Sequence, residues 1–414
     1  MYEELSSPLK HGYHKRIAEK LESTNPENPP LSDLAYHYAQ AGNIDKSVEF
    51  SFAAGIDELT KFSRIEAIKH FQYVIQAVGE NKKYIKEKET ALESLGDAFR
   101  LSSMYKESIK AYDELATSTR DDNLKFRVYK KAMDSGFHLG DAHCMMEFIT
   151  KAEPLAAGDR LKNGLILLEK GRVSLFEGKN FTWLKDFEES FQILEEETSF
   201  GDVSFGAFDA WVALLGVAGN HPRIGKFRES IAESLLMIAW AEERFEPGGL
   251  QAAYAYAGNN FNECFLSDEA LIILAKPKRT YQKTKTGVYS WLFIADIFSA
   301  WTLMQKADFP EALSHALAAY EFSKKTDATV EKAIVYSTLT RVYALLGDAD
   351  CSNDFFAKLT KLPPEVMPYP YVFVNLTKAV HLAVNGQWDE SNRIFQENLV
   401  FGKISFPMPT GRLL

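Results

Sequence analysis

Histidines are the first residues in this chain whose type and spacing could support chemistry. His11 and His14 lie three positions apart, which places two imidazoles on one face of a helix, where they could share a metal ion. No third ligand follows them at a suitable spacing, so solvent-facing or interface histidines are the favoured interpretation. His138 and His143 flank Gly140, which indicates a turn, and are interpreted as loop-edge and packing residues. The sequence therefore predicts no metal site.

Motifs for nucleophilic or metal-assisted catalysis are missing from the sequence. It contains no GxSxG, no HExxH and no local pairing of cysteine with histidine. The acidic pair Glu188 and Glu189 and the run from Glu195 to Glu197 are typical of the solvated face of a helix. We predict a chain that is not an enzyme and carries no cofactor. An enzyme whose site is assembled from distant residues stays an open alternative.

A phosphate-binding loop is also missing. The nearest sequence to GxxxxGK[ST] is GNHPRIGKF, which begins at Gly219. Its spacing is one residue too long, and Phe227 stands where a hydroxyl would bind magnesium. The sequence therefore predicts no nucleotide binding.

One stretch, residues 276–285, is basic enough to attract an anion or a nucleic acid. Proline and threonine within and beside it favour an exposed loop whose lysines serve solubility. An anion- or nucleic-acid-binding role is kept as the alternative. Its candidate residues are Lys276, Lys278, Arg279, Lys283 and Lys285.

The elements that would position these residues are short helices arranged in pairs. In residues 34–54, apolar residues line one face of a first helix, Gly42 ends it, and small residues fall on the inward face of a second helix. The positions are Leu34, Ala35, Tyr38, Ser47, Val48 and Ala54. This pattern resembles the tetratricopeptide repeat (TPR), a helical hairpin of about 34 residues with small side chains where the helices cross.

Four more copies keep the same register. They are Leu95, Gly96, Phe99, Tyr105, Ser108, Ile109, Tyr112 and Leu115; Ala300, Leu303, Phe309, Ala312, Leu313, Ala316 and Ala319; Leu339, Tyr343, Gly347, Ser352, Phe356 and Leu359; and Ala379, Leu382, Gly386, Trp388, Ser391 and Phe395. Residues 64–78 add a further second helix. Between residues 121 and 277 the repeat signal is diffuse, although helices are expected at 123–137, 159–176, 205–217 and 224–240.

The expected fold class is all-α, a right-handed α-α superhelix built as a TPR-like solenoid of helical hairpins. Hydrophobic residues make up 46% of the chain and charged residues 25%, which is ordinary globular usage. The net charge of -10 disfavours a nucleic-acid or anionic-membrane surface over the whole chain. The most apolar segment, 287–304, carries Asp296 near its middle and is interpreted as a buried solenoid helix.

Three segments are expected along the chain. Residues 1–30 form an N-terminal helix and a connector in which Pro26, Pro29 and Pro30 exclude helix. Residues 31–275 form a first helical array, and residues 287–414 form a second array continuous with the first. Three scattered cysteines without metal spacing, and no apolar leader at the N-terminus, predict a reducing, cytoplasmic location.

The N-terminal stretch YEELSSPLKHGYHKRIAEKLE, followed by a proline-containing gap and LAYHYAQAGNIDKSVEFSFAAG, resembles a junction in STAND regulatory ATPases. These signal-transduction ATPases are related to the maltose-regulon activator, and the resemblance covers about residues 2–120. It implies the superhelical sensor or partner-binding arm of such a protein. The ATPase module itself is missing from this sequence, so we expect a fragment or a separately encoded arm, with residues 1–30 as the junction to an upstream module.

Function is expected to come from the surface of the repeats, because stacked hairpins form an extended groove lined by their first helices. The register places these residues in that groove: Tyr36, Gln40, Glu93, Asp97, Arg100, Trp301, Gln305 and Arg341. Mixed charges with aromatic residues suit a protein or peptide segment better than a nucleic acid, and no membrane partner is expected. The tryptophans are interpreted as fillers between helices, and Trp388 as a core residue because it matches Tyr105 and Phe309.

Overall fold

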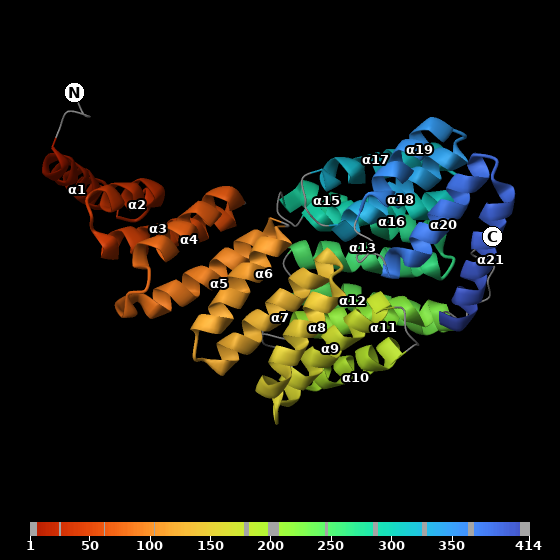
Figure 1. The fold of residues 1–414 in the computed structure, drawn as a ribbon, viewed down its shortest axis with the longest axis horizontal. Helices are drawn as coiled ribbons and strands as arrows, with labels where there is room; N and C mark the ends of the chain where they lie inside the picture. Colours follow the sequence, from red (N-terminus) through yellow and green to blue (C-terminus); the bar gives the residue numbers. More distant parts are fainter. Residues whose placement is uncertain are drawn as a thin grey trace. The chain divides into compact units, whose positions relative to one another are not determined.

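The computed structural model describes residues 6–24, 26–61, 63–102, 104–177, 182–197, 207–244, 247–284, 289–324, 329–362 and 368–405. Within these ranges the chain is a succession of helices, and no strand occurs in them (Figure 1). The all-α, TPR-like fold class is therefore confirmed. None of the described helices is long and apolar enough to cross a membrane.

The helices pair as antiparallel hairpins along the chain. Their bounds are α1 Ser7–Thr24, α2 Leu31–Gln40, α3 Ile44–Thr60, α4 Arg64–Val78, α5 Ile85–Leu101, α6 Tyr105–Ser118, α7 Asp122–Leu139, α8 Ala142–Ala152, α9 Arg160–Glu177, α10 Thr182–Glu197, α11 Ala207–Asn220, α12 Phe227–Arg244, α13 Pro247–Glu263, α14 Ser267–Leu274, α15 Lys276–Thr284, α16 Tyr289–Gln305, α17 Phe309–Ser323, α18 Thr329–Leu345, α19 Ala349–Thr360, α20 Pro368–Val384 and α21 Trp388–Ser405. Short 3₁₀ turns are η1 Lys82–Tyr84, η2 Glu153–Ala156 and η3 His221–Ile224. All four helices expected in the diffuse region are present, as α7, α9, α11 and α12.

The turn inside a hairpin uses two residue types in succession. A residue with positive φ ends the first helix, and the side chain of the next residue, Asn or Asp, caps the second helix. Gly42, with φ of 72°, precedes Asn43, whose Oδ1 accepts a hydrogen bond from the backbone N–H of Lys46 at 3.2 Å. The arrangement recurs at Gly140–Asp141, Ala307–Asp308 and Gly347–Asp348. The predicted helix end at Gly42 and turn at Gly140 are thus confirmed.

Glycine allows two successive helices to cross closely. A Cβ atom at Gly55 would lie 2.6 Å from Cε1 of Phe71, and one at Gly96 would lie 2.6 Å from Cδ1 of Tyr112. Both distances are far inside van der Waals contact, and both rings are fully buried. The prediction of a small residue at the close crossing is therefore confirmed at Gly96.

Small residues also mark the second helix of each hairpin, where the sequence predicts inward-facing positions. The serines at this position, Ser47, Ser108, Ser352 and Ser391, are all buried. Ser352 Oγ donates to the carbonyl oxygen of Thr340 at 3.0 Å, and Ser391 Oγ donates to that of Ala379 at 2.7 Å. Ala312 occupies the same position in its hairpin and is fully buried. The hydroxyls of Ser352 and Ser391 therefore join the second helix of their hairpins to a carbonyl group of the first.

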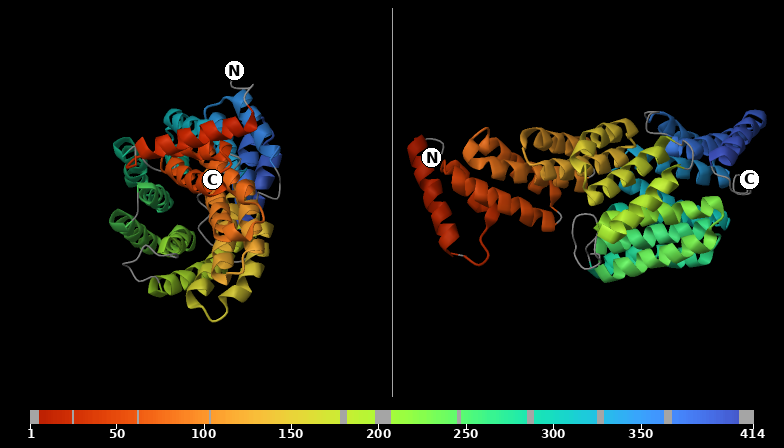
Figure 2. Two further views of the ribbon diagram at one scale, coloured as in Figure 1. Left: turned by 90° about the vertical axis from the view of Figure 1, so that its left-hand side faces the viewer. Right: turned by 90° about the horizontal axis from the view of Figure 1, so that it is seen from below.

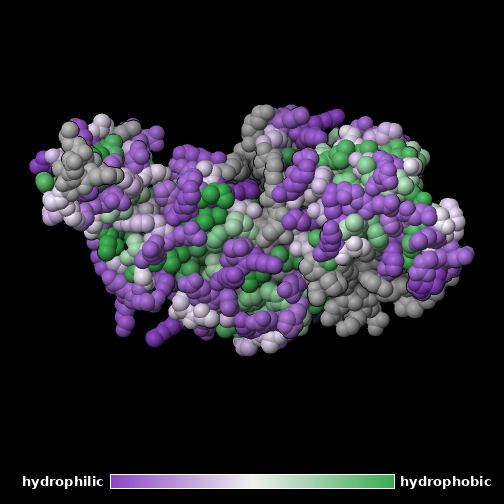
Figure 3. All heavy atoms as spheres, turned by 45° about the horizontal axis from the view of Figure 1, so that its top comes forward, coloured by the Kyte–Doolittle hydropathy of each residue, from purple (hydrophilic) through white to green (hydrophobic). Residues whose placement is uncertain are grey.

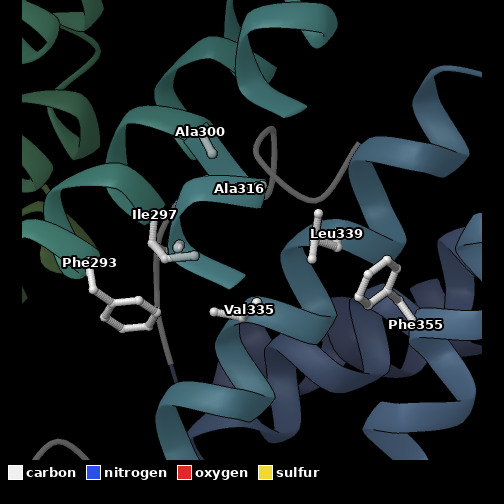
Figure 4. Close-up of a cluster of buried hydrophobic side chains, with 8 residues drawn as sticks. Phe293, Ile297, Ala300, Ala316, Val335, Leu339 and Phe355 are labelled. Carbon is white, nitrogen blue, oxygen red and sulfur yellow. The ribbon is translucent and has the colours of Figure 1, made fainter. Parts of the chain in front are cut away.

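The chain divides into two compact units, residues 1–135 and 136–414, which are described separately. In the second unit the first helices of successive hairpins, α9, α11, α13, α16, α18 and α20, contact one another in order, and α20 also contacts α9 (Figure 2). One core cluster of this unit, drawn in Figure 4, joins Phe293 and Ile297 of α16, Ala316 of α17, Leu339 of α18 and Phe355 of α19. We call the side of the six first helices that faces away from their second helices the inner surface.

Two local predictions are wrong. Residues 276–284 are not a loop but form helix α15, because Lys276 can cover the ring of Tyr254 while the apolar part of the stretch packs on α13. Trp388 is not a core residue: it is 67% exposed at the start of α21. The matching Tyr105 is buried in a hairpin that is followed by another, whereas no described helix follows α21.

Candidate functional site

An aromatic stripe runs along α16 on the inner surface. Trp291, Phe298, Trp301 and Gln305 occupy positions i, i+7, i+10 and i+14, which lie on one face of a helix. The three aromatic side chains are half-buried and Gln305 is exposed. Tyr256 of the preceding first helix, α13, lies against this stripe, with ring centroids 5.9 Å from Trp291 and 5.8 Å from Phe298. The stripe therefore spans two first helices.

Trp301 joins α16 to the next first helix, α18. Its indole Nε1 donates to Oγ1 of Thr338 at 2.9 Å, and Thr338 Oγ1 donates to the carbonyl oxygen of Ile334 at 2.8 Å. Phe298 lies 5.4 Å from Trp301 between ring centroids. Both hydrogen-bonding groups at this junction are thus satisfied within the protein, which fixes the indole ring in place.

Arg341 follows Thr338 by one helical turn on α18. Its side chain is half-buried, and no carboxylate pairs with it in the part of the chain that the structure describes. Burial lowers the pKa of the Arg341 guanidinium to about 10, since no neighbouring negative charge opposes the loss of solvent. It stays protonated at neutral pH, so the inner surface carries a partly desolvated positive charge that no described carboxylate neutralises.

Asn259 adds an unsatisfied acceptor on α13, three residues beyond Tyr256. Its Oδ1 is buried without a hydrogen-bond partner, while the adjacent Asn260 donates from Nδ2 to Oγ of Ser234 at 3.0 Å. An unpaired buried amide oxygen costs roughly 1–3 kcal/mol. A ligand that supplies an N–H donor at this position would recover that cost.

In the first unit the predicted groove residues of α5 form ion pairs, unlike Arg341 in the described part of the second unit. The carboxylate of Glu93 on α5 accepts hydrogen bonds from Nε and Nη2 of Arg127 on α7, at 2.8 and 2.6 Å. The two residues are 34 positions apart in the sequence. Lys131 bridges Glu93 at 2.9 Å and Asp97 at 2.8 Å. Equivalent positions of neighbouring repeats therefore carry opposite charges and neutralise each other.

Arg100 and Asp97 belong to the same set of contacts. Arg100 Nη1 lies 3.4 Å from Oδ2 of Asp134, again 34 residues away, and the Tyr112 hydroxyl donates to Asp97 at 2.6 Å. Burial raises the pKa of Tyr112, and the adjacent Asp97 carboxylate raises it further. The structure thus places Glu93, Asp97 and Arg100 together but uses them to join α5 to α7.

Tyr36 and Gln40 lie on α2 and are both exposed, Tyr36 to 56%. Tyr36 packs edge-on against His14 of α1 and His37, with centroids 5.6 and 5.2 Å away. His14 Nδ1 lies 2.7 Å from His37 Nδ1. Burial lowers the pKa of His14, and the nearby His37 and His11 lower it further. His14 is thus an interface residue between α1 and α2, as the sequence predicts.

The basic residues of α15 are partly engaged. Lys276 Nζ lies 4.6 Å from the ring centre of Tyr254. Lys278 Nζ lies 3.7 Å from Oδ1 of Asp296, which also accepts a hydrogen bond from Nδ1 of His315 at 2.6 Å. Arg279 and Lys283 are exposed. Lys285 lies outside the described residues. No group of three His, Cys, Asp or Glu that could hold a metal ion occurs in the described ranges.

The sequence predicts Trp301, Gln305 and Arg341 as groove residues, and the structure places them on adjacent first helices of one unit. The sequence-based prediction does not include their neighbours Tyr256, Asn259, Trp291, Phe298 and Thr338. The spacing of Trp291, Phe298 and Trp301 was the available signal, but α16 is apolar on nearly every face, so that stripe does not stand out.

No protein-family model matches the sequence, and a search of curated proteins finds no match. Solved structures do resemble it. A Rap protein complexed with competence and sporulation factor has 11% identity and a TM-score of 0.60, covering 86% of this chain and 98% of that one. The apo form of RapI has 13% identity and a TM-score of 0.47, covering 86% and 97%.

A STAND protein with a tetratricopeptide repeat sensor from Pyrococcus horikoshii has 14% identity and a TM-score of 0.43, covering 92% of this chain. The match spans 56% of that protein's length. The Rap complex, whose TM-score is above 0.5, shows the fold: this chain is a TPR-like helical repeat protein.

Proposed function

We propose that this chain is a non-catalytic interaction module that binds an extended segment of a partner protein, or a peptide, along the inner surface of its second unit. The observation that carries the proposal is the aromatic stripe of α16 with Tyr256 beside it. Aromatic side chains that are half-buried on a first helix supply large contact area with little conformational freedom to lose, which is typical of peptide-binding surfaces.

The composition of this surface favours a peptide over a nucleic acid. A phosphate backbone is bound by clustered lysines and arginines, whereas the stripe is aromatic and has the cation Arg341 at its side. Two of the basic residues of α15 are engaged with Tyr254 and Asp296. An extended peptide also supplies the N–H groups that the buried Oδ1 of Asn259 lacks.

The finer role that we propose is the sensor or partner-binding arm of a STAND-type signalling ATPase in the cytoplasm. It is supported by the resemblance of residues 2–120 to the junction that precedes such arms, and the three free cysteines suit a reducing compartment. An ATPase module encoded directly upstream of this chain would support the role, and an unrelated upstream gene would argue against it.

Peptide selection with the full chain tests the binding proposal. We expect a displayed library of random twelve-residue peptides to yield sequences that bind the immobilised protein. Substituting Trp301→Leu keeps an apolar side chain but removes the ring and its N–H, and we expect the dissociation constant of a selected peptide to rise about tenfold or more. The matched control is Trp388→Leu, because Trp388 is exposed on a second helix. Equal affinities of the two variants would refute binding at the stripe.

A further inference from the structure

The position of Arg341 on α18 is fixed by three neighbouring contacts. Ser337, one turn before it, shares a hydrogen bond of 2.5 Å with Thr377 of α20, and Thr338 accepts from Trp301 of α16. Tyr343, on the opposite side of the helix, stacks on Phe355 of α19 with ring centroids 5.8 Å apart. Arg341 therefore lies between α16 and α20 and faces away from the second helix, on the inner surface.

The side chain of Arg341 also has a defined direction. Long side chains in a helix lean toward its N-terminus, which for Arg341 is the turn that carries Ser337 and Thr338. The hydroxyls of both residues are already hydrogen-bonded. By this general preference we expect the guanidinium near hydroxyl groups that already make hydrogen bonds within the protein.

Arg341 differs in this respect from two arginines of the first unit, Arg127 and Arg100. Arg127 makes a two-pronged contact with Glu93, and Arg100 reaches Asp134. These pairs show how a repeat protein neutralises charges on its first helices. Among the described residues, Arg341 has no such carboxylate, although burial of an unpaired cation opposes folding.

We propose that Arg341 binds a carboxylate of the segment held on the inner surface, so that the ligand is a peptide with an acidic group next to an apolar or aromatic residue. This inference rests on the proposed function and specifies its ligand. The acidic group is either an Asp or Glu side chain or the C-terminal carboxylate of the peptide. The apolar residue next to it would pack on Trp301 and Phe298, which lie one first helix away.

A carboxylate fits this site better than a phosphate. The planar guanidinium matches two carboxylate oxygens in a two-pronged contact, and one positive charge balances one negative charge. A phosphate near neutral pH carries close to two charges and is commonly bound by several cations or backbone N–H groups. Trp301, Thr338 and Ser337, the neighbours identified above, are uncharged.

The test compares two peptide libraries on the full chain. One library has random residues with a free C-terminal acid, and the other has the same residues with a C-terminal amide. Wild-type protein is expected to enrich Asp or Glu at one fixed position in both libraries if a side chain is recognised. It is expected to bind only the acid library if the terminus is recognised. Either result supports the proposal, and selected peptides that lack any acidic group would overturn it.

Two arginine variants complete the experiment. Arg341→Met keeps the length of the side chain and removes its charge, and we expect it to weaken binding of a selected peptide about tenfold or more. We also expect it to raise the Tm of the free protein, because an unpaired, half-buried charge has been removed. Arg228→Met, on the exposed side of the second helix α12, should change neither quantity.

The outcomes separate this inference from the function on which it rests. If Trp301→Leu weakens binding while Arg341→Met binds the same peptide as tightly as wild type, the binding surface stands and the role of Arg341 is wrong. If wild-type protein enriches no peptide from either library, both the function and the inference are wrong. A folded Arg341→Met protein is verified by its unchanged helical circular dichroism.

Discussion

Gly96→Ala should destabilise the first unit although alanine is the better helix former. The new Cβ would lie 2.6 Å from Cδ1 of Tyr112, and ordinary contact needs about 3.5 Å or more. Tyr112 is fully buried and its hydroxyl donates to Asp97 at 2.6 Å, so the ring can move only by disturbing that bond. The substitution therefore forces the crossing of α5 and α6 apart.

The expected size of the effect follows from three contributions. Removing glycine from a helix interior gains about 1 kcal/mol. Overpacking of a well-filled contact costs about 1–3 kcal/mol, and weakening the Tyr112 to Asp97 hydrogen bond costs about 1 kcal/mol. The net change in the free energy of unfolding is a loss of about 1–3 kcal/mol.

Gly12→Ala is the matched control for this experiment. Gly12 lies inside α1 of the same unit, and a Cβ built there meets no atom within 4 Å. The same substitution should therefore stabilise the protein by about 0.5–1 kcal/mol. Urea unfolding followed by circular dichroism measures both variants. If Gly96→Ala stabilises the chain as Gly12→Ala does, the close crossing at Tyr112 does not exist as described.

Two further predictions concern stability. Ala312→Leu adds three carbons at a fully buried position and should cost about 1–3 kcal/mol in urea unfolding, whereas Glu311→Gln, exposed one residue earlier, should stay within about 0.5 kcal/mol; equal effects would refute the repeat register. Burial raises the pKa of Glu93, but Arg127 and Lys131 outweigh it and hold that pKa below its ordinary value of 4.5. The stabilisation from Glu93 is thus present above about pH 4.5 and lost as the pH falls through the lower, folded-state pKa. Glu93→Gln should therefore lower the free energy of unfolding at pH 7 and make that free energy fall less steeply in acid. An unchanged acid dependence would exclude this role of Glu93.

The repeat architecture could be predicted because its determinants are local in the sequence. Small residues such as Gly96, Ser108 and Ala312 occupy fixed positions of their repeats, since a close helix crossing tolerates only small side chains. The turn residues Gly42 and Asn43 are equally local, because one sets a positive φ and the other caps the next helix. Such patterns identify the hairpins without knowledge of how distant helices pack.

Contacts between charged residues of neighbouring repeats are harder to predict from the sequence, although the repeat period indicates one of them. Glu93 and Arg127 carry opposite charges one repeat period of 34 residues apart, so their contact could have been inferred from the period itself. The unpaired state of Arg341 could not, because it depends on the charges that every neighbouring helix presents. Trp388 was misassigned for a similar reason: its register matches buried residues, but burial requires a following hairpin.

Exposed hydrophobic patches alone do not identify the proposed binding site. In Figure 3 hydrophobic side chains gather in separate patches within a mainly hydrophilic surface. Exposed apolar residues such as Ile65, Ile272 and Phe265 lie outside the aromatic stripe. Isolated exposed residues of this kind are common in monomeric proteins and do not by themselves mark a ligand site. The assignment therefore depends on the geometry of Trp301 and Arg341.

Photo-cross-linking of a selected peptide tests the central claim most directly. A benzophenone amino acid placed at Gln305, the exposed end of the α16 stripe, should cross-link the peptide, and unlabelled peptide should compete with that reaction. The same group at Ile272, which is 64% exposed on the second helix α14, should not react. Cross-linking at Gln305 alone is the predicted result. Equal reaction at both sites, or reaction at Ile272 alone, would contradict binding along the inner surface.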